Sequence, residues 1–346
     1  MRKDKIVIIG DGGWGTTLAI LLSNKGYSVT LWGAFADYVS YLQRKRVNTK
    51  FLPGIKIPRD ISITADLKLA LAGKKVVVLA VPSQHLRSVL RRIKKAGFSK
   101  KAAYLSVTKG IEVTSLKRMS EIVRQELGGV KLAVLSGPTI AHEAAIGVPT
   151  TAVIASTDNK TRKCLQDMFM TEQFRIYTND DVIGVELGGS LKNVIAIACG
   201  VSDGLGFGAN TKAAILSRGL AEISRLGHAM GAKISTFSGI SGLGDLVTTC
   251  ISQYSRNRGL GEQIGRGKKF GRMGKYMQIP AYSAGRPACR QAGIAEGVPT
   301  AKSAYLLSLK YKVDMPITRE VYQVLYKNKS PLKAVRDLMT RARKEE

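Results

Sequence analysis

A short glycine-rich segment near the start of the chain has the spacing of a phosphate-binding loop. Gly10, Gly12 and Gly15 form a G-x-G-x-x-G pattern that follows the apolar run Ile6–Ile9 and opens a helical stretch, Trp14–Asn24. Such a loop lets the backbone approach a pyrophosphate, whose negative charge then lies at the positive end of a helix. A glycine triad alone could be an ordinary turn, but its place at the first strand-to-helix turn favours dinucleotide binding.

The residues that follow the second predicted strand bear on which dinucleotide binds. An acid there would hydrogen-bond the ribose 2′-hydroxyl of NAD, whereas a basic side chain would pair with the 2′-phosphate of NADP. The segment Leu31–Asp37 gives neither sign clearly, because Asp37 comes slightly late and fits a helix surface equally well. The choice between NAD and NADP therefore stays open.

The elements that must position this loop alternate along the first half of the chain. Short β-rich runs, mostly separated by helical patterns, predict a mainly parallel sheet wrapped by helices. From about Asp180 onward, Val182–Ala198 and Ala209–Met230 carry apolar residues at helical spacing and strand signals nearly vanish. We predict an α/β fold with an N-terminal Rossmann-type, doubly wound domain (1–180) and a C-terminal all-helical, substrate-binding domain (181–346). The predicted strands are Lys5–Ile9, Ser28–Trp32, Lys75–Ala80, Ala103–Val107, Lys131–Leu135 and Thr150–Ala155.

Composition limits the class of protein. The 346 residues are 45% hydrophobic and 23% charged, which is ordinary for a globular chain, and no apolar run approaches the roughly 18 residues of a membrane span. Lys and Arg number 54 against 25 Asp and Glu, and the resulting charge of +29 favours anionic ligands. Because the basic residues are spread along the chain, a solvated basic surface ranks above specific nucleic-acid or membrane binding.

The reactive side chains that often mark other functions are sparse. The four cysteines are far apart and no H-E-x-x-H motif is present, so we predict neither a disulfide framework nor a metal site, and we expect a cytoplasmic protein. The segment Gly265–Gly293 is rich in Gly, Arg, Lys and Pro and is expected to be a long surface loop or a lid.

Six short motifs follow one another along nearly the whole chain. They are Gly10–Ala19, Thr108–Gly110, Ser136–Thr139, Gly188–Asn193, Gly242–Leu246 and Ser255–Asn257. Any one of these motifs could occur by chance, but their common order is highly specific, and the set resembles the bacterial-type NAD(P)-dependent sn-glycerol-3-phosphate dehydrogenases. Two departures concern the cofactor side: Gly13 stands where the family often has serine, and the stretch before Ile294 is longer than usual.

The resemblance assigns the catalytic side chains. Reduction of a ketone by hydride needs a proton donor for the developing alkoxide, and the reverse reaction needs a base. The matching lysine of the family is Lys192, preceded by Gly188 and Gly189, which we interpret as leaving room for a ligand. Lys109 and Asp245 would align the substrate, and burial or the second cation would lower the pKa of Lys192. Alone, Lys192 could be a surface lysine and Asp245 a helix N-cap.

The remaining site residues are also implied by the resemblance. Arg256 is the expected phosphate anchor, although by itself it could be a solvated arginine of a basic segment. The implied substrate-binding residues are Lys109, Gly137, Thr139, Lys192, Asp245, Ser255, Arg256 and Asn257. The implied cofactor-binding residues are Gly10, Gly12, Gly13, Trp14, Gly15, Lys109, Ala141, Arg256, Ile294 and Glu296.

The expected function is the interconversion of dihydroxyacetone phosphate and sn-glycerol 3-phosphate with NAD or NADP, supplying glycerol 3-phosphate for phospholipid synthesis. The family also implies a homodimer and a small phosphorylated substrate. A β-hydroxyacid or phosphogluconate-type dehydrogenase is the nearest alternative enzyme, because related folds serve those reactions. A basic nucleic-acid- or membrane-associating protein that retains a dinucleotide fold is the alternative from another class.

Overall fold

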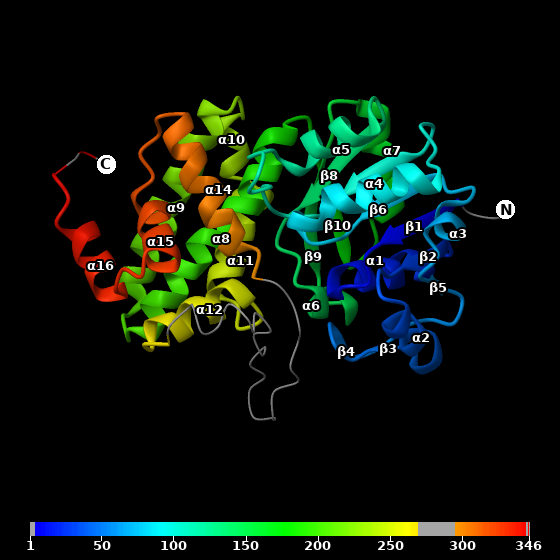
Figure 1. The fold of residues 1–346 in the computed structure, drawn as a ribbon, viewed down its shortest axis with the longest axis horizontal. Helices are drawn as coiled ribbons and strands as arrows, with labels where there is room; N and C mark the ends of the chain where they lie inside the picture. The colour runs from blue at the N-terminus through cyan, green and yellow to red at the C-terminus, as the bar shows by residue number, and fades with distance from the viewer. Residues whose placement is uncertain (1–3, 269–294, 344, 346) are drawn as a thin grey trace.

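A sheet-containing half and a helical half lie side by side in the computed structural model (Figure 1). The structure describes residues 4–268, 295–343 and 345. Ile294 and residues 269–293 of the predicted surface loop therefore lie outside the described residues. The first residue of that predicted loop, Gly265, is the last residue of a helix.

Eight strands form one sheet in the order β10-β9-β8-β7-β6-β1-β2-β5. The run from β5 to β8 is parallel, β9 pairs antiparallel with β8, and β10 is parallel to β9. A two-stranded ribbon, β3-β4, lies outside it. The strands are β1 (Lys5–Ile9), β2 (Ser28–Trp32), β3 (Val47–Asn48), β4 (Leu52–Lys56), β5 (Ser62–Thr64), β6 (Val76–Leu79), β7 (Ala103–Ser106), β8 (Lys131–Ser136), β9 (Thr150–Ala155) and β10 (Phe174–Asn179).

Helices cover both faces of the sheet, which confirms the doubly wound architecture. Alternate residues of β1 show this directly, because Ile6 and Ile8 pack with α1, α2 and α7, whereas Val7 and Ile9 pack with α3, α4 and α5. The helices of this half are α1 (Gly13–Asn24), α2 (Ala36–Lys45), α3 (Leu67–Leu71), η1 (Ser83–His85), α4 (Leu86–Ala96), α5 (Met119–Leu127), α6 (Ala141–Ala145) and α7 (Asn159–Phe169).

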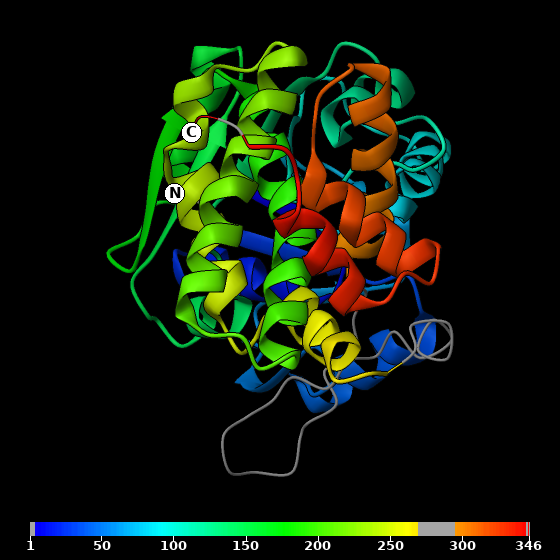
Figure 2. The same cartoon turned by 90° about the vertical axis from the view of Figure 1, so that its left-hand side faces the viewer.

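The second half is helical and is built around α8, and Figure 2 shows its helices stacked in front of the sheet. We propose that the boundary between the two domains lies between residues 180 and 181, because the last strand ends at Asn179 and α8 begins at Val182. Its elements are α8 (Val182–Gly204), α9 (Ala209–Ala229), α10 (Ile234–Phe237), the π-helical turn η2 (Ile240–Gly244), α11 (Asp245–Ile251), α12 (Arg256–Gly265), α14 (Gly297–Lys310), α15 (Pro316–Tyr326) and α16 (Pro331–Met339).

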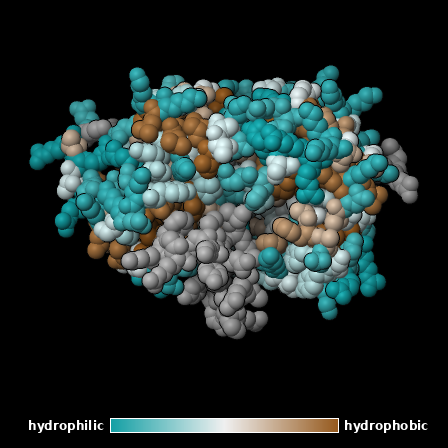
Figure 3. Space-filling view, viewed as in Figure 1, coloured by the Kyte–Doolittle hydropathy of each residue, from teal (hydrophilic) through white to brown (hydrophobic). Residues whose placement is uncertain are grey.

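Helix α8 is the apolar core of this half. Among the described residues it is the one helix long and apolar enough to cross a membrane, yet 89% of its most apolar stretch is buried by neighbouring helices. On the face shown in Figure 3 most side chains are hydrophilic, and the hydrophobic ones form separate groups. The apolar character of α8 is therefore explained by packing inside the protein.

Helices α8 and α12 pack with their backbones in contact. Each carries a G-x-x-x-G spacing, Gly200 with Gly204 and Gly261 with Gly265, which places both glycines on one helix face. A Cβ on Gly200 would collide with the carbonyl oxygen of Arg258, and one on Gly261 would lie 2.8 Å from the backbone nitrogen of Val201. These glycines fix α12 against α8.

The substitution Gly261→Ala should destabilise the protein. Alanine favours a helix by about 1 kcal/mol over glycine, but the forced separation of two packed helices costs roughly 1–3 kcal/mol or more. We expect a lower thermal unfolding temperature by differential scanning calorimetry. The control is Gly129→Ala, at an exposed glycine with no other atom within 4 Å of an added Cβ. An unfolding temperature for Gly261→Ala at or above that of the control would contradict this packing.

Candidate active site

The glycine loop joins β1 to α1 and leaves the N-terminus of α1 open. Gly10 has φ +123°, and a Cβ there would lie 2.5 Å from the carbonyl oxygen of Ala80, so no other residue fits without strain. Gly12 precedes the helix, no side chain caps it, and no atom lies within 4 Å of an added Cβ. A helix N-terminus that no side chain caps leaves its backbone N–H groups available to the pyrophosphate of a dinucleotide.

Packing explains two other residues of the loop. A Cβ on Gly13 would lie 2.6 Å from the carbonyl oxygen of Phe51, so the departure to glycine at this position lets β4 approach the loop. The Trp14 ring meets Phe174 edge-on at 6.0 Å between centroids, and its buried Nε1–H has no acceptor among the described residues. Ala141 begins α6 beside the loop, and its carbonyl accepts a hydrogen bond from Thr17.

Asp245 is fully buried and holds two lysines. Its Oδ2 accepts a 2.7 Å hydrogen bond from the ammonium of Lys109, and its Oδ1 accepts one from Lys192. Lys192 also donates to the hydroxyl of Thr249 at 2.6 Å, and the Ser136 hydroxyl lies 3.4 Å from Asp245 Oδ2. Asp245 is the first residue of α11 and makes no capping bond, so the structure does not use it as the N-cap that its sequence position also allowed.

Burial and charge act together on Lys192. Its side chain is 8% exposed, and the loss of hydration together with the nearby charge of Lys109 lowers its pKa to about 7, although Asp245 opposes the shift. An amine with a pKa near 7 can both give and accept a proton at neutral pH.

The ends of two neighbouring strands bring Lys109 to this carboxylate. Lys109 follows β7 and donates a 2.9 Å hydrogen bond to the carbonyl of Gly137, which follows β8, and it lies 3.4 Å from the hydroxyl of Thr139. Gly137 has φ +145°, and a Cβ there would lie 2.9 Å from the Cα of Ala152. The turn after β8 therefore requires glycine, as the carboxyl ends of the parallel strands converge on the site.

The two glycines before Lys192 serve packing, and the interpretation that they leave room for a ligand is wrong. A Cβ on Gly188 would lie 2.6 Å from the carbonyl oxygen of Ser241, and one on Gly189 would collide with the hydroxyl of Ser136. Protein atoms already fill the space above both glycines. Their effect is to let α8 approach the end of β8 and the turn that precedes Asp245.

The N-terminus of α12 lies beside α8 and α14. The Ser255 hydroxyl caps α12 by accepting a hydrogen bond from the N–H of Arg258 at 3.2 Å. The buried amide of Asn257 donates to Asn193 of α8 and accepts from the N–H of Gly297 in α14, both at 2.9 Å. Asn257 therefore ties three helices together and keeps the start of α12 near Lys192, the residue before Asn193.

Arg256 and Glu296 form the charged rim of the same region. The Arg256 side chain is exposed, and the negative charge of Glu296 lies close enough to favour its charged form. Glu296 accepts hydrogen bonds from the N–H of Ser83, at 3.0 Å, and from its hydroxyl. Since Ser83 follows β6 and Glu296 precedes α14, this contact joins the two halves of the molecule.

The structure thus brings together most of the residues named from the sequence. The lysines, Asp245, Gly137 and Thr139 form one connected group, whereas the loop residues and Ala141 form a second; Ile294 lies outside the described residues. Sequence reasoning assigned no role to Thr249, Ser136, Ser83 and Asn193. Thr249 had a signal because it lies one helical turn after Asp245, and Ser136 and Asn193 had one because each lies in a motif that carries the resemblance.

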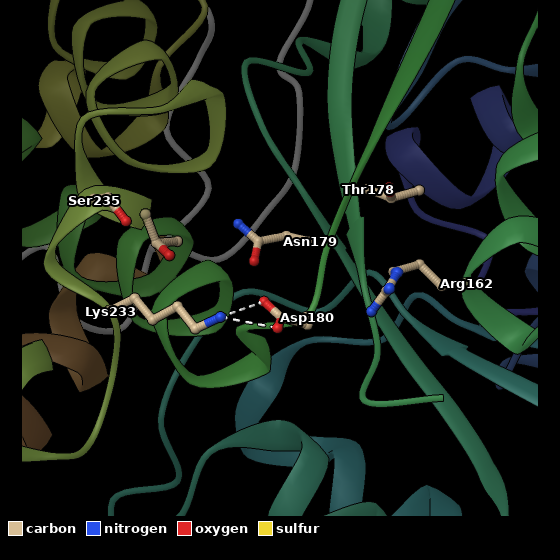
Figure 4. Close-up of a pocket in the computed structure, with 7 residues that line it drawn as sticks. Arg162, Thr178, Asn179, Asp180, Lys233 and Ser235 are labelled. Atoms are coloured by element: carbon tan, nitrogen blue, oxygen red, sulfur yellow. Dashed lines mark hydrogen bonds and ion pairs between the residues drawn. The ribbon is translucent and has the colours of Figure 1, made fainter. Parts of the chain in front are cut away.

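A separate cavity of about 430 Å³ lies at the end of β10 (Figure 4) and contains none of these residues. Lys233 points at Asp180 across it and donates to both carboxylate oxygens at 2.8 Å. Arg162, on the other side, is bonded to the Ser156 carbonyl and to Asn159. The charged side chains that line this cavity are therefore already bonded to one another or to other groups of the protein.

The fold and the site together define a dinucleotide-binding oxidoreductase with a buried lysine whose pKa is lowered to about 7. Comparison with known proteins gives the family. The model for the N-terminus of NAD-dependent glycerol-3-phosphate dehydrogenase matches residues 5–162, and the model for its C-terminus matches residues 181–336. The chain belongs to the NAD-dependent glycerol-3-phosphate dehydrogenase family. It is therefore an NAD(P)-dependent enzyme, and no feature of the described residues favours the alternative functions.

Individual relatives support this assignment over the full length. The chain is 46% identical to glycerol-3-phosphate dehydrogenase [NAD(P)+] of Thermoanaerobacter sp., over 99% of this chain and 98% of the relative. It is equally similar, at 46%, to that of Prosthecochloris aestuarii, over 99% of both chains. The crystal structure of glycerol-3-phosphate dehydrogenase from Coxiella burnetii has a TM-score of 0.90 and 37% identity, covering 98% of this chain and 99% of that one.

Replacing Asp245 by asparagine should destabilise the folded state strongly. The change leaves the Lys109 ammonium facing a neutral amide and removes the carboxylate that favours the charged form of Lys192, and breaking a buried ion pair from one side costs about 3–5 kcal/mol. We expect a loss of this size in the free energy of urea unfolding at pH 7. The matched change at an exposed pair, Asp180→Asn opposite Lys233, should cost less than about 1 kcal/mol. Equal losses of unfolding free energy in the two variants would contradict the larger contribution to stability that we assign to Asp245.

Proposed function

We propose that the protein interconverts dihydroxyacetone phosphate and sn-glycerol 3-phosphate, with Lys192 as the residue that transfers the proton. The observation that carries this proposal is the buried lysine with a pKa near 7, bound to the Asp245 carboxylate that it shares with Lys109. When bound, NAD(P)H supplies the hydride that converts the substrate carbonyl carbon to a secondary alcohol.

Lys192 then completes the reduction. Its ammonium donates a proton to the carbonyl oxygen as that oxygen gains negative charge, and Lys192 is left as the neutral amine. In the oxidation direction the neutral amine takes the proton of the secondary hydroxyl. The hydrogen bonds to Asp245 and Thr249 hold Nζ in one place for both directions.

Lys109 stabilises the developing oxyanion and keeps the second carboxylate oxygen of Asp245 occupied. Its contacts with Gly137 and Thr139 fix its ammonium at the end of the sheet. A preorganised cation in a largely buried site stabilises charge more effectively than the same cation in water. We propose that Thr139 and the backbone of Gly137 line the substrate next to this ammonium.

The phosphate of the substrate binds at the start of α12. Arg256 supplies a guanidinium that can bind two phosphate oxygens, and the ten-residue helix behind it directs its positive end to the same place. Ser255 accepts the capping bond through its oxygen, so its hydroxyl hydrogen is free to donate to the phosphate. Asn257 acts by fixing α12 against α8 and α14.

The cofactor lies along the loop from Gly10 to Gly15, with Trp14 and Ala141 beside it. We propose that Glu296, held by Ser83, contacts the nicotinamide half, since it bridges the end of β6 and the helical half. The enzyme supplies glycerol 3-phosphate for phospholipid synthesis, consistent with its family, and acts in the cytoplasm, where the free thiols of Cys164, Cys199 and Cys250 would stay reduced. We propose that it does so as a homodimer.

Oxidation of NADH or NADPH by the purified protein, followed at 340 nm with dihydroxyacetone phosphate, tests the reaction. Turnover supports the proposal. A protein that binds dinucleotide but turns over neither cofactor with this substrate would point to another hydroxy or keto substrate.

The pH dependence should run in opposite directions for the two reactions. Oxidation requires the neutral amine of Lys192, so kcat/KM should rise as pH increases through about 7. Reduction requires the ammonium, so kcat/KM should fall as pH increases through the same region.

Lys192→Met should abolish both reactions while NADH still binds, as measured by calorimetry. Turnover of this variant near the wild-type rate would exclude Lys192 as the proton-transfer residue.

Replacing Arg256 by alanine should mainly weaken substrate binding. The loss of a charge-assisted bidentate contact is worth about 1.5–3 kcal/mol, so we expect KM for dihydroxyacetone phosphate to rise at least about tenfold. The control is Arg258→Ala, because the guanidinium of Arg258 is bonded to Asp203 within the protein. A change in NADH affinity with an unaltered substrate KM would assign Arg256 to the cofactor alone.

A further inference from the structure

Strand β2 ends beside the glycine loop without a side chain that could recognise the adenosine ribose. The next residues, Ala34 and Phe35, are exposed and uncharged, and 73% of the surface of Phe35 is accessible. Asp37, the acid considered from the sequence, is exposed in the first turn of α2. Recognition of the ribose must therefore come from another element.

The carboxylate of Asp11, in the glycine loop itself, lies against that strand end. A Cβ on Gly33 would be 2.5 Å from Asp11 Oδ2, so glycine at position 33 is what leaves room for the carboxylate. The backbone of Asp11 is fixed from the other side, because its carbonyl accepts a 2.8 Å hydrogen bond from the buried amide of Asn48. The position of this carboxylate is therefore set by packing on two sides.

This carboxylate has few hydrogen-bond donors. Its Oδ2 is enclosed against Gly33 and has no partner among the described residues, so hydrogen bonds from a ligand would go to the other oxygen, Oδ1, of this partly exposed residue. Burial raises the pKa of the carboxyl. The groups that offset the shift are its own backbone N–H and the charge of Lys50. A carboxylate held with so few donors would gain hydrogen bonds from hydroxyl groups placed next to it.

We propose that Asp11 makes this enzyme select NADH over NADPH. Its carboxylate takes the place of the missing acid at the end of β2: it accepts hydrogen bonds from the ribose hydroxyls of NADH and repels the 2′-phosphate of NADPH. The inference deepens the proposed function, because it rests on a dinucleotide binding along the glycine loop.

Lys50 is the side chain that could favour the opposite choice. Its exposed ammonium lies over aromatic rings, 5.2 Å from the centre of Phe51 and 5.7 Å from that of Tyr38. A long exposed lysine gains little from pairing in water, whereas Asp11 is fixed beside the strand end. The charge of Asp11 therefore dominates the choice.

Direct binding to the full chain, without substrate, tests the selectivity. Isothermal titration calorimetry would compare NADH with NADPH, and 5′-AMP with adenosine 2′,5′-bisphosphate, which isolate the adenosine end. We expect the wild type to bind the members without the 2′-phosphate at least about tenfold more tightly, a modest effect for a −1 charge beside a dianion. Asp11→Asn should reduce this ratio about tenfold, mainly by tightening NADPH.

The controls separate charge from structure. Asp37→Asn removes the same charge from the exposed acid nearby and should leave the ratio unchanged. Asp11→Ala should change it in the same direction as Asp11→Asn. Because the Oδ2 atom of Asp11 has no hydrogen-bond partner among the described residues, both variants should melt near the wild-type temperature.

Three outcomes would overturn the inference while leaving the proposed reaction intact. They are a wild type that binds NADPH as tightly as NADH, an unchanged ratio in Asp11→Asn, and an equal loss of affinity for both cofactors in that variant. Failure of the wild type to bind either dinucleotide would overturn the proposed function as well.

Discussion

The contact on which the site depends is one buried carboxylate shared by two ammonium groups. Asp245 has no exposed surface, so its charge must be met within the protein, and Lys109 and Lys192 each bind one of its oxygens. Those lysines come from opposite halves of the molecule, one after β7 and one in the middle of α8. The ion pairs therefore fix how the helical half lies against the carboxyl ends of the strands.

Close backbone packing makes that contact possible. Gly188 and Gly189 let α8 approach the turn before Asp245 and the hydroxyl of Ser136, and the paired glycines of α8 and α12 keep the start of α12 within reach of Lys192. Side chains at these positions would separate the elements by more than a hydrogen bond can span. The same residue type thus serves two purposes in the chain, because Gly12 leaves open space at the start of α1, where no atom lies within 4 Å of an added Cβ.

The sequence patterns predicted those elements whose position depends mainly on residues close together in the chain. Strands β1, β2 and β9 have the bounds expected from their apolar runs, and the glycine loop lies where its spacing placed it. Strand β10 was missed, because its outward residues are polar and Phe174–Asn179 reads as a weak alternation. The antiparallel pairing of β9 and the filled space above Gly188 depend on tertiary contacts, which no single segment encodes. Likewise, the closeness of Asp11 to Gly33 depends on packing between the glycine loop and the end of β2.

The charges of the site explain why one lysine can lose its proton near neutrality. Burial is the largest cause of the lowered pKa of Lys192, and it outweighs the attraction of the Asp245 carboxylate for the ammonium form. Lys109, which is bound to the second oxygen of Asp245, adds a like charge that lowers the pKa further. Two cations against one anion also leave the site net positive when both lysines are protonated, which favours an anionic substrate. The arrangement that would attract an anionic substrate is thus the same one that lowers the pKa of Lys192, as the proposed proton transfer requires.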